Sequence, residues 1–133
     1  MHELSIEVSG VPEPQKRPRT FMNRNLGRVM TWSPKSKWTG LVYIAARRIR
    51  PPQPLDGPLD VNIVFNLPKP KSSKNTWPIA RGDWDNYAKG TCDALTQAGW
   101  WKDDCLIVVA RVVKQYCMPG RAPGVTIWVK QLA

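Results

Sequence analysis

The feature that most restricts the fold of this chain is an alternation over PLDVNIVFNL, positions 58–67, in which the residues between the apolar positions are polar except for Val64. Apolar side chains recur at every second position, namely Leu59, Val61, Ile63 and Phe65. A period of two belongs to a β-strand with one buried face. Such a strand needs neighbouring strands and a covering layer, so the fold contains a sheet packed against other elements.

Three other segments are predicted as strands. Residues 3–10 alternate apolar and polar side chains in the same way and form the first strand. The runs 105–116 and 124–132 are rich in β-branched residues and are joined by a turn-rich link, so we predict that they pair as a hairpin. Two segments rich in basic residues, near 11–33 and 68–82, lack apolar periodicity and are predicted as long loops.

Two segments have the periodicity of helices. Ser33 is predicted as the N-cap of a helix near 34–50, which gathers basic residues in its last turn and stops at two prolines. A second helix is predicted at 85–98, because small and apolar residues recur at helical spacing before Gly99. Its predicted buried positions are Ala88, Thr91, Cys92, Leu95 and Ala98.

The order of these elements predicts the fold class. Strand, helix, strand, helix and two strands fit an α/β (α+β) fold, with one mixed β-sheet of about four or five strands and two main helices packed on it. The length of 133 residues suits one hydrophobic core, so we predict a single domain over 1–133. Trp100 and Trp101 follow the second helix and are predicted to lie in the core and at its rim.

The charge of the chain restricts its partners. There are 20 Lys and Arg residues against 10 Asp and Glu, and the net charge of +10 favours a polyanion such as nucleic acid. The longest apolar run, 105–110, is too short to span a bilayer, and the first ten residues lack the apolar core of a signal peptide. We expect no membrane partner and a cytoplasmic location.

Cysteine and histidine offer little for catalysis. Three widely spaced cysteines predict neither a disulfide framework nor a zinc knuckle, and the one histidine is His2. Catalysis therefore has to rely on carboxylates, lysines and a hard metal ion.

Half of the acidic residues gather in one part of this basic chain, between positions 83 and 104. Carboxylate oxygens are the ligands of Mg²⁺ and Mn²⁺, so acids within a nucleic-acid-binding surface predict a metal site that faces a phosphate. Asp83 and Asp85 stand at the start of the second helix, with Lys89 one turn further on the face of Asp85. Asp104 joins them if the following strand begins beside the N-terminus of that helix.

Simpler structural roles fit the same residues one at a time. An Asp before a helix is often an N-cap, and an Asp pair between elements is often a turn. Lys89 and Asp93 have the spacing of an i,i+4 surface ion pair, which we favour over metal ligation for Asp93. The clustering of charge supports the functional interpretation more than any single residue does.

The stretch RGDWDNYAKGTCDALTQAGWWKDDCLIVVARVVK, positions 81–114, strongly resembles the RusA family of Holliday junction resolvases, which is typical of phages and prophages. Its pattern is D-x-D-N-x-x-K, then D-A-L-x-x-A-G, then aromatic residues and a D-D pair leading into a strand. The segment GVPEPQKRPR resembles the phage branch, and the resemblance covers most of the chain from Gly10 onward. It implies a homodimeric, Mg²⁺-dependent endonuclease that makes paired nicks in four-way DNA junctions, in a bacterial host cell.

The resemblance also assigns residues. Carried over position by position, the essential acids fall on Asp83, Asp85 and Asp104, and the essential lysine falls on Lys89. The three carboxylates would hold one or two Mg²⁺ ions, with Mn²⁺ as an alternative, and the lysine would stabilise charge on the phosphate or orient the attacking water. The role of Asp103, the first acid of the D-D pair, is left open.

This chain departs from some relatives immediately before the first acid, where they have a basic residue. Here the position is Gly82, preceded by Arg81. Basic residues of the two loops are predicted to hold DNA phosphates: Lys16, Arg17, Arg19, Lys69, Lys71, Lys74 and Arg81, together with Arg47, Arg48 and Arg50. Trp77 or Trp84 either stacks on bases at an open junction centre or packs in the core.

A homodimer is expected because junction resolution needs two related cuts, and one small domain with one acidic cluster supplies a single site. The strands of 105–132, or an exposed sheet edge, are the candidate contact. Two other functions are kept as alternatives. One is a nuclease for other branched or flap DNA, and the other is a basic nucleic-acid-binding module without catalysis.

Overall fold

The computed structural model describes residues 3–15, 19–32, 36–80 and 82–133. Five residues with predicted roles lie outside them: Lys16, Arg17, Ser33, Pro34 and Arg81. Along the chain the elements are β1 (Glu3–Ser9), β2 (Arg19–Asn23), β3 (Arg28–Trp32), α1 (Lys37–Arg48), β4 (Leu59–Leu67), α2 (Trp84–Ala98), the 3-10 helix η1 (Asp104–Leu106), β5 (Ile107–Tyr116) and β6 (Gly124–Gln131).

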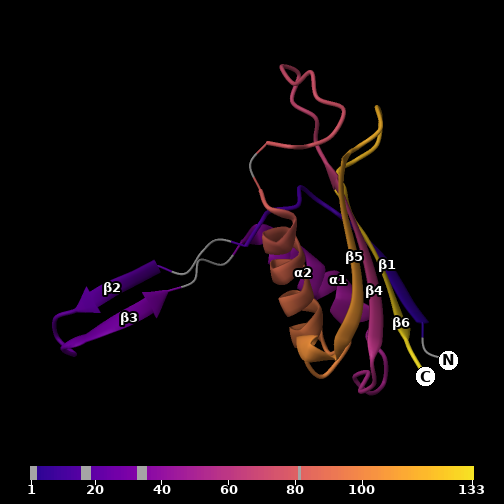
Figure 1. Ribbon diagram of the computed structural model, residues 1–133. Coiled ribbons are helices and arrows are strands. Elements are labelled where there is room, and N and C mark those ends of the chain that lie inside the picture. The colour runs from indigo at the N-terminus through magenta and orange to yellow at the C-terminus, as the bar shows by residue number, and fades with distance from the viewer. Residues whose placement is uncertain (1–2, 16–18, 33–35, 81) are drawn as a thin grey trace.

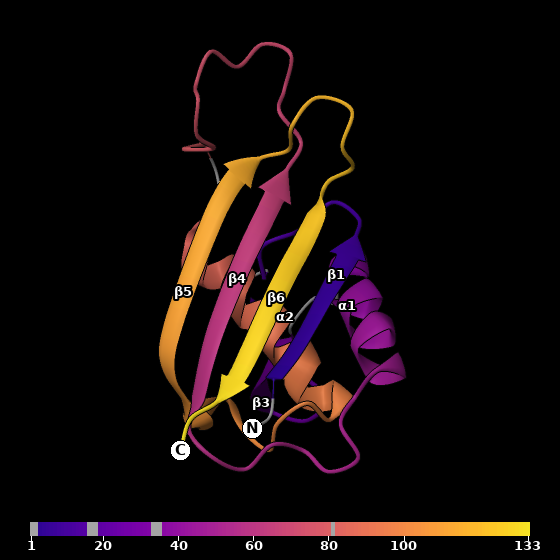
Figure 2. The ribbon, with the colours of Figure 1, turned by 90° about the vertical axis from the view of Figure 1, so that its right-hand side faces the viewer.

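Four strands form a mixed sheet in the order β1-β6-β4-β5. β4 and β5 run parallel, whereas β6 is antiparallel to both of its neighbours. α1 and α2 pack on one face of this sheet (Figure 1), and the other face carries neither of them (Figure 2). The predicted fold class, a mixed sheet with two main helices packed on it, is confirmed.

β4 lies inside the sheet and has the strictest alternation of burial. Its buried side chains are Leu59, Val61, Ile63, Phe65 and Leu67, and the residues between them are half-buried. β6, the neighbour of β4 in the sheet, adds Val125 and Ile127 to this core, and the helices complete it from the other side with Trp38, Val42, Ala46 and Leu95. Each large apolar side chain contributes about 1.5–3 kcal/mol when it is buried, so this layer supplies most of the stability of the fold.

The predicted hairpin between 105–116 and 124–132 is wrong. β5 and β6 occupy these segments, but β4 lies between them and pairs with both. β6 buries Val125, Ile127 and Val129, so it stabilises the fold most at an interior position. β5 follows α2 and joins the other side of β4 as a parallel neighbour.

A β-hairpin lies within the segment predicted as a basic loop near 11–33, and that prediction is wrong for 19–32. β2 and β3 pair antiparallel, with Met22 opposite Val29. They form a separate two-stranded sheet that stands away from the rest of the fold (Figure 1). Met22 and Val29 are exposed, so the segment lacks the apolar and polar alternation of a strand with one buried face.

Helix α1 begins later than predicted. Its N-cap is Ser36, whose hydroxyl accepts a hydrogen bond from the Thr39 backbone N–H (3.2 Å). In sequence, the dipeptide Ser-Pro at 33–34 is a strong signal for the start of a helix. The helix nevertheless starts after Ser36, because the Ser36 side chain satisfies the free backbone N–H of Thr39.

Helix α2 agrees with its predicted bounds to within one residue. Gly99 ends it in the left-handed conformation (φ 91°), as expected for a glycine after a helix. The buried face consists of Tyr87, Gly90, Thr91, Ala94, Leu95 and Ala98, so Ala88 and Cys92 are only half-buried. Neither of these two helices, the α-helices of the described residues, is long and apolar enough to cross a membrane.

Trp100 and Trp101 both lie in the core, at 0% and 1% exposure, so the predicted rim position is wrong. The Trp100 indole N–H donates a hydrogen bond to the Ala46 carbonyl (2.8 Å) and so ties the end of α2 to α1. Each buried indole N–H has a partner, as burial of a polar group requires.

Candidate active site

Two of the predicted catalytic acids, Asp83 and Asp85, lie at the N-terminal end of α2. Asp83 is the N-cap residue by position, but its carboxylate accepts no capping hydrogen bond. Asp85 is in the first turn, and its Oδ1 accepts a hydrogen bond from the Asn86 N–H (3.0 Å). Both side chains are exposed. The Asp83 side chain therefore does not act as an N-cap, and its carboxylate oxygens are available to a ligand.

The chain reaches this helix end through a residue that has to be glycine. Gly82 has a φ of +107°, and a Cβ there would lie 2.6 Å from the ring of Tyr87. The Gly82 carbonyl accepts a hydrogen bond from Nζ of Lys114 on β5 (2.6 Å). Any side chain at this position would require Tyr87 to move, so the packing before Asp83 favours glycine.

Lys89 lies one turn after Asp85, on the same side of α2. Its Nζ is 3.9 Å from Oδ2 of Asp93, so the predicted i,i+4 pair is confirmed. The Lys89 side chain is 65% exposed, and an exposed ion pair of this kind is weak. The ammonium group is therefore free to contact a phosphate.

Asp104 opens η1, directly before β5, and its carboxylate is held by two side chains. Its Oδ1 accepts one hydrogen bond from the Trp101 indole N–H (2.9 Å) and another from the Thr96 hydroxyl. Trp101 is buried, and Asp104 and Thr96 are half-buried. Asp104 is therefore a carboxylate with a fixed orientation, in contrast to the exposed acids at the start of α2.

Asp93 shares this part of α2, and the sequence interpretation missed its contact with Asp104. Burial, and then a hydrogen bond with Asp104, raise the pKa of the Asp93 carboxyl. Its Oδ2 also accepts a hydrogen bond from Nε2 of Gln15 (3.3 Å). Burial and these two carboxylates raise the pKa of the Cys92 thiol to about 12, so this thiol is protonated at neutral pH. Only the i,i+4 spacing from Lys89 was visible in sequence.

The acids at the two ends of α2 are far apart. Asp104 contacts Thr96, which lies eleven residues beyond Asp85, or about 16 Å along the helix axis. The expectation that Asp104 joins the other two acids is therefore wrong within one chain, because β5 begins beside the C-terminal half of α2. No group of three metal-ligating side chains comes together within the described part of the chain.

Asp103, whose role was left open, has a structural role. Its Oδ1 accepts a hydrogen bond from the Cys105 backbone N–H (2.9 Å) at the start of η1. This bond holds the pKa of the Asp103 carboxyl below its usual value. The carboxylate caps η1 and thereby orients the adjacent Asp104.

Exposed residues of the 68–82 loop stand at the same end of the molecule as the start of α2 (Figure 1). They include three predicted DNA contacts, Lys69, Lys71 and Lys74. Trp77 in this loop and Trp84 in α2 are 56% and 59% exposed, so the alternative of core packing is wrong for both. Arg19, a further predicted contact, lies in β2.

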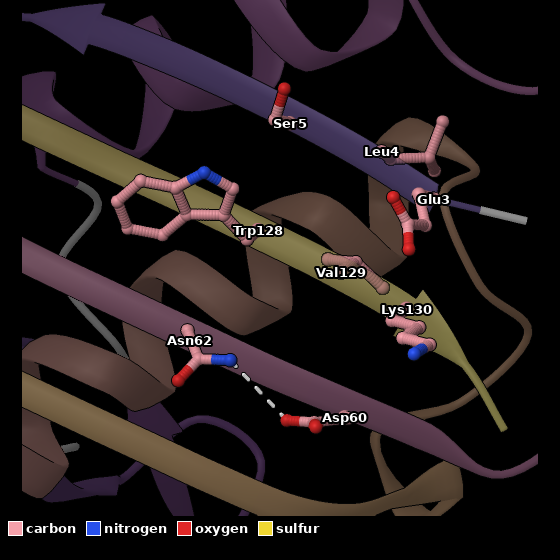
Figure 3. Close-up of a pocket in the computed structure, with 8 residues that line it drawn as sticks. All are labelled: Glu3, Leu4, Ser5, Asp60, Asn62, Trp128, Val129 and Lys130. Carbon is pink, nitrogen blue, oxygen red and sulfur yellow. Dashed lines mark hydrogen bonds between the residues drawn. The ribbon is translucent and has the colours of Figure 1, made fainter.

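A hollow of about 450 Å³ lies on the face of the sheet opposite the helices. Residues of β1, β4 and β6 line it, and Asn62 donates a hydrogen bond to Asp60 across its floor (3.3 Å; Figure 3). None of the predicted catalytic residues lines this hollow. It is therefore separate from the candidate active site.

A family model and one relative match most of the chain, and two further relatives match about a third of it. The family model described as endodeoxyribonuclease RusA matches residues 9–130. The uncharacterized protein YqaN of Bacillus subtilis (strain 168) is 31% identical, over 98% of this chain and 97% of its own length. The crossover junction endodeoxyribonuclease RusA of Escherichia coli O139:H28 is 49% identical over 47 residues, and that of Enterobacteria phage 82 is 47% identical over 47 residues. Each of these shorter matches covers 35% of this chain and 39% of the relative. Because the family model spans nearly the whole chain, the protein belongs to the RusA family of endodeoxyribonucleases.

Proposed function

We propose that this protein is a Mg²⁺-dependent, structure-specific endodeoxyribonuclease that resolves four-way DNA junctions by paired, symmetric nicks. Membership of the family and the names of its junction-cutting relatives support this chemistry. The main support is the arrangement of charged residues along α2. Asp83 and Asp85 are exposed at its N-terminal end, Asp104 is held beside its C-terminal half, and Lys89 lies between these two places. A chain of net charge +10 suits a DNA substrate. The family domain is proposed to span 1–133.

The acids of a single chain fit a hard cation only in part. Asp83 and Asp85 offer exposed carboxylate oxygens, the donors that Mg²⁺ and Mn²⁺ prefer. The third acid, Asp104, contacts Thr96 near the other end of α2 and is therefore too far away to bind the same ion. A second copy of the chain can supply it. When bound, the ion would polarise the scissile phosphate and lower the pKa of an attacking water.

A homodimer that pairs through β5 would unite the separated acids. β5 is the terminal strand of the four-stranded sheet, and its exposed Val108 and Val109 add apolar surface at this edge. An unpaired strand edge of this kind favours pairing with another strand. The β5 edge, which belongs to the predicted contact region 105–132 and is also an exposed sheet edge, is therefore the proposed contact.

The geometry of such a pairing follows from what stands at each end of β5. Lys114, near its end, contacts the residue before Asp83, whereas Asp104 opens the short helix η1 that directly precedes its start. Antiparallel pairing of two β5 strands across a two-fold axis places these opposite ends side by side. The partner subunit's Asp104 would then approach the Asp83 end of α2, and two equivalent sites would form. Two sites are what paired cuts in a four-way junction require.

Lys89 is proposed to stabilise the negative charge that develops on the phosphate. Lys89 lies one turn after Asp85, and its Nζ is 3.9 Å from Oδ2 of Asp93, which in turn contacts Asp104. A fixed positive charge acts most strongly where DNA and protein exclude water. Lys69, Lys71 and Lys74 are proposed to hold flanking phosphates, and the exposed Trp77 and Trp84 to stack on unpaired bases.

The direct test is cleavage of three matched DNAs, a four-way junction, a flap and a linear duplex, with Mg²⁺ and with EDTA. Mg²⁺-dependent cuts at symmetric positions of the four-way junction are expected, with Asp85→Asn as the inactive control. Preferred cutting of the flap would favour the nuclease for other branched DNA. Binding of all three DNAs without cleavage would favour the non-catalytic module.

A further inference from the structure

We propose that the β2–β3 hairpin is a DNA-contacting arm, which enters a groove of one duplex arm of the substrate and holds its phosphates with Arg24 and Arg28. The inference rests on the proposed function, because it assumes a branched DNA substrate. Neither arginine belongs to the candidate active site, and neither is among the basic residues predicted from the sequence to hold DNA phosphates. The arm would extend the protein–DNA contact from the junction centre to the flanking duplex.

The charge of this segment points to a polyanion. No acidic residue occurs between Glu13 and Asp56, a stretch that holds half of the basic residues of the chain. Arg24 and Arg28 are exposed, and neither forms an ion pair within the described residues. A positive ribbon without acids of its own attracts phosphates and repels another copy of itself.

The tip of the hairpin has a fixed shape. The Asn23 side-chain oxygen accepts hydrogen bonds from the backbone N–H groups of Asn25 (3.0 Å) and Leu26 (3.1 Å). Gly27 then closes the turn with a φ of +63°, a conformation that glycine adopts without strain. The two arginines flank this closed turn. Because the turn is already ordered, less conformational entropy is lost when the tip binds a ligand.

The dimensions of the hairpin match a DNA groove. The major groove admits a two-stranded β-ribbon. Strands of five residues span about 17 Å at 3.4 Å per residue, which is the length of about five base pairs. The exposed Met22, Leu26 and Val29 add apolar surface that suits thymine methyl groups.

The hairpin joins the rest of the protein beside α2, so it is placed to contact DNA near the cut. Gln15, the last described residue before it, donates its backbone N–H to the Asn86 carbonyl in the first turn of α2 (3.0 Å). Its side chain also bonds to Asp93. The arm is therefore anchored on the helix that carries the candidate active site, and it stands away from the rest of the fold (Figure 1).

The proposal is tested with a variant that removes both charges, Arg24→Gln/Arg28→Gln. The matched control, Arg121→Gln/Lys130→Gln, removes two exposed charges outside the hairpin and the candidate active site. Both are measured on four-way junctions whose arms end in closed loops and have roughly 6 or roughly 20 base pairs, lengths chosen from the five-base-pair reach of the ribbon. Binding is measured in EDTA over a range of salt concentrations, and cleavage is measured in Mg²⁺.

We expect the hairpin variant to raise Kd about tenfold on the long-armed junction and to flatten the dependence of log Kd on log salt by about 2, one for each lost phosphate contact. On the short-armed junction it should match the control variant and still cleave. Equal Kd values for the two variants on long arms, or an equal loss on both arm lengths, would overturn the proposal. Failure of the wild-type protein to cleave either junction would count against the proposed function instead.

A second measurement identifies what the tip touches. A photoreactive amino acid at Leu26 should crosslink to duplex DNA within an arm of the long-armed junction. Crosslinks between two protein chains, or a change from dimer to monomer in the arginine variant, would overturn the proposal in favour of a contact between copies. Crosslinking to anionic vesicles in preference to the junction would overturn it in favour of a membrane.

Discussion

The two ends of α2 hold their acids in opposite ways. At the N-terminal end, Asp83 and Asp85 are exposed, and the Asp83 carboxylate makes no capping hydrogen bond. Beside the C-terminal half, Asp104 is half-buried and bound by Trp101 and Thr96. One end is open to a ligand, whereas the other presents a carboxylate whose direction is set by the core.

This difference predicts that substitutions at the two ends affect activity and stability differently. Exposed carboxylates contribute little to folding, so substitutions at the open end should change activity alone. A half-buried carboxylate with two hydrogen-bond donors is part of the packing as well, so substitutions around it should change both.

Loss of a carboxylate at either end should abolish cleavage. Asp83→Asn, Asp85→Asn and Asp104→Asn are each expected to lower the single-turnover rate by at least about 10²-fold, the scale for losing a group that acts on the transition state. Binding of the junction should persist or tighten, because a negative charge facing the phosphates is removed. If all three variants lost binding together with cleavage, the acids would have a structural role instead.

Lys89→Ala should have the next largest effect. We expect a loss of roughly 10- to 100-fold in cleavage rate, with the free energy of unfolding changed by less than about 0.5 kcal/mol because the side chain is exposed. Lys102→Ala is the matched control, since Lys102 is also exposed and paired with one acid, Asp56. Equal cleavage rates in the two variants would remove Lys89 from the mechanism.

Thr96→Val should show how much the contacts around Asp104 contribute to the free energy of unfolding. It keeps the shape of the side chain but removes the hydroxyl that contacts Asp104, and should cost about 1–2 kcal/mol of unfolding free energy. Asp85→Asn, at the open end, should change that free energy by less than about 0.5 kcal/mol. Urea unfolding of both variants measures the contrast, and equal losses would break it.

Asp93 should give the packed end a weak pH dependence. Its pKa is raised above 3.8 by burial and by Asp104, so the native state keeps this proton at pH values where the unfolded chain has lost it. The free energy of unfolding therefore falls as pH rises from 3.8 through the raised pKa. Asp93→Asn should reduce that fall when urea unfolding is followed in EDTA. An unchanged pH profile would show that Asp93 is not perturbed.

Local sequence patterns predict much of the fold. The alternation from Leu59 to Phe65 identifies β4 because one face of that strand is buried. Helix α2 is found to within one residue, since small residues recur on its buried face and Gly99 ends it. The family pattern points to the acids at 83, 85 and 104 without any knowledge of their arrangement.

What sequence could not reveal depends on contacts between distant elements. The position of β6 between β1 and β4 follows from its burial rather than from its neighbour in sequence. The hairpin at 19–32 has no buried face to impose a period. The separation of Asp104 from Asp85 appears only once β5 is seen to start beside Thr96, at the far end of the helix.

In the proposed dimer, one catalytic site combines the open end of α2 from one chain with the packed end from another. Asp85→Asn and Asp104→Asn chains, each inactive alone and carrying different affinity tags, should be combined and the mixed dimers isolated by both tags. If the site is shared, one of the two sites in a mixed dimer has all its acids, so nicking of one strand should return to about half the wild-type rate. Mixed dimers as inactive as either parent would contradict the claim and place each complete site within a single chain.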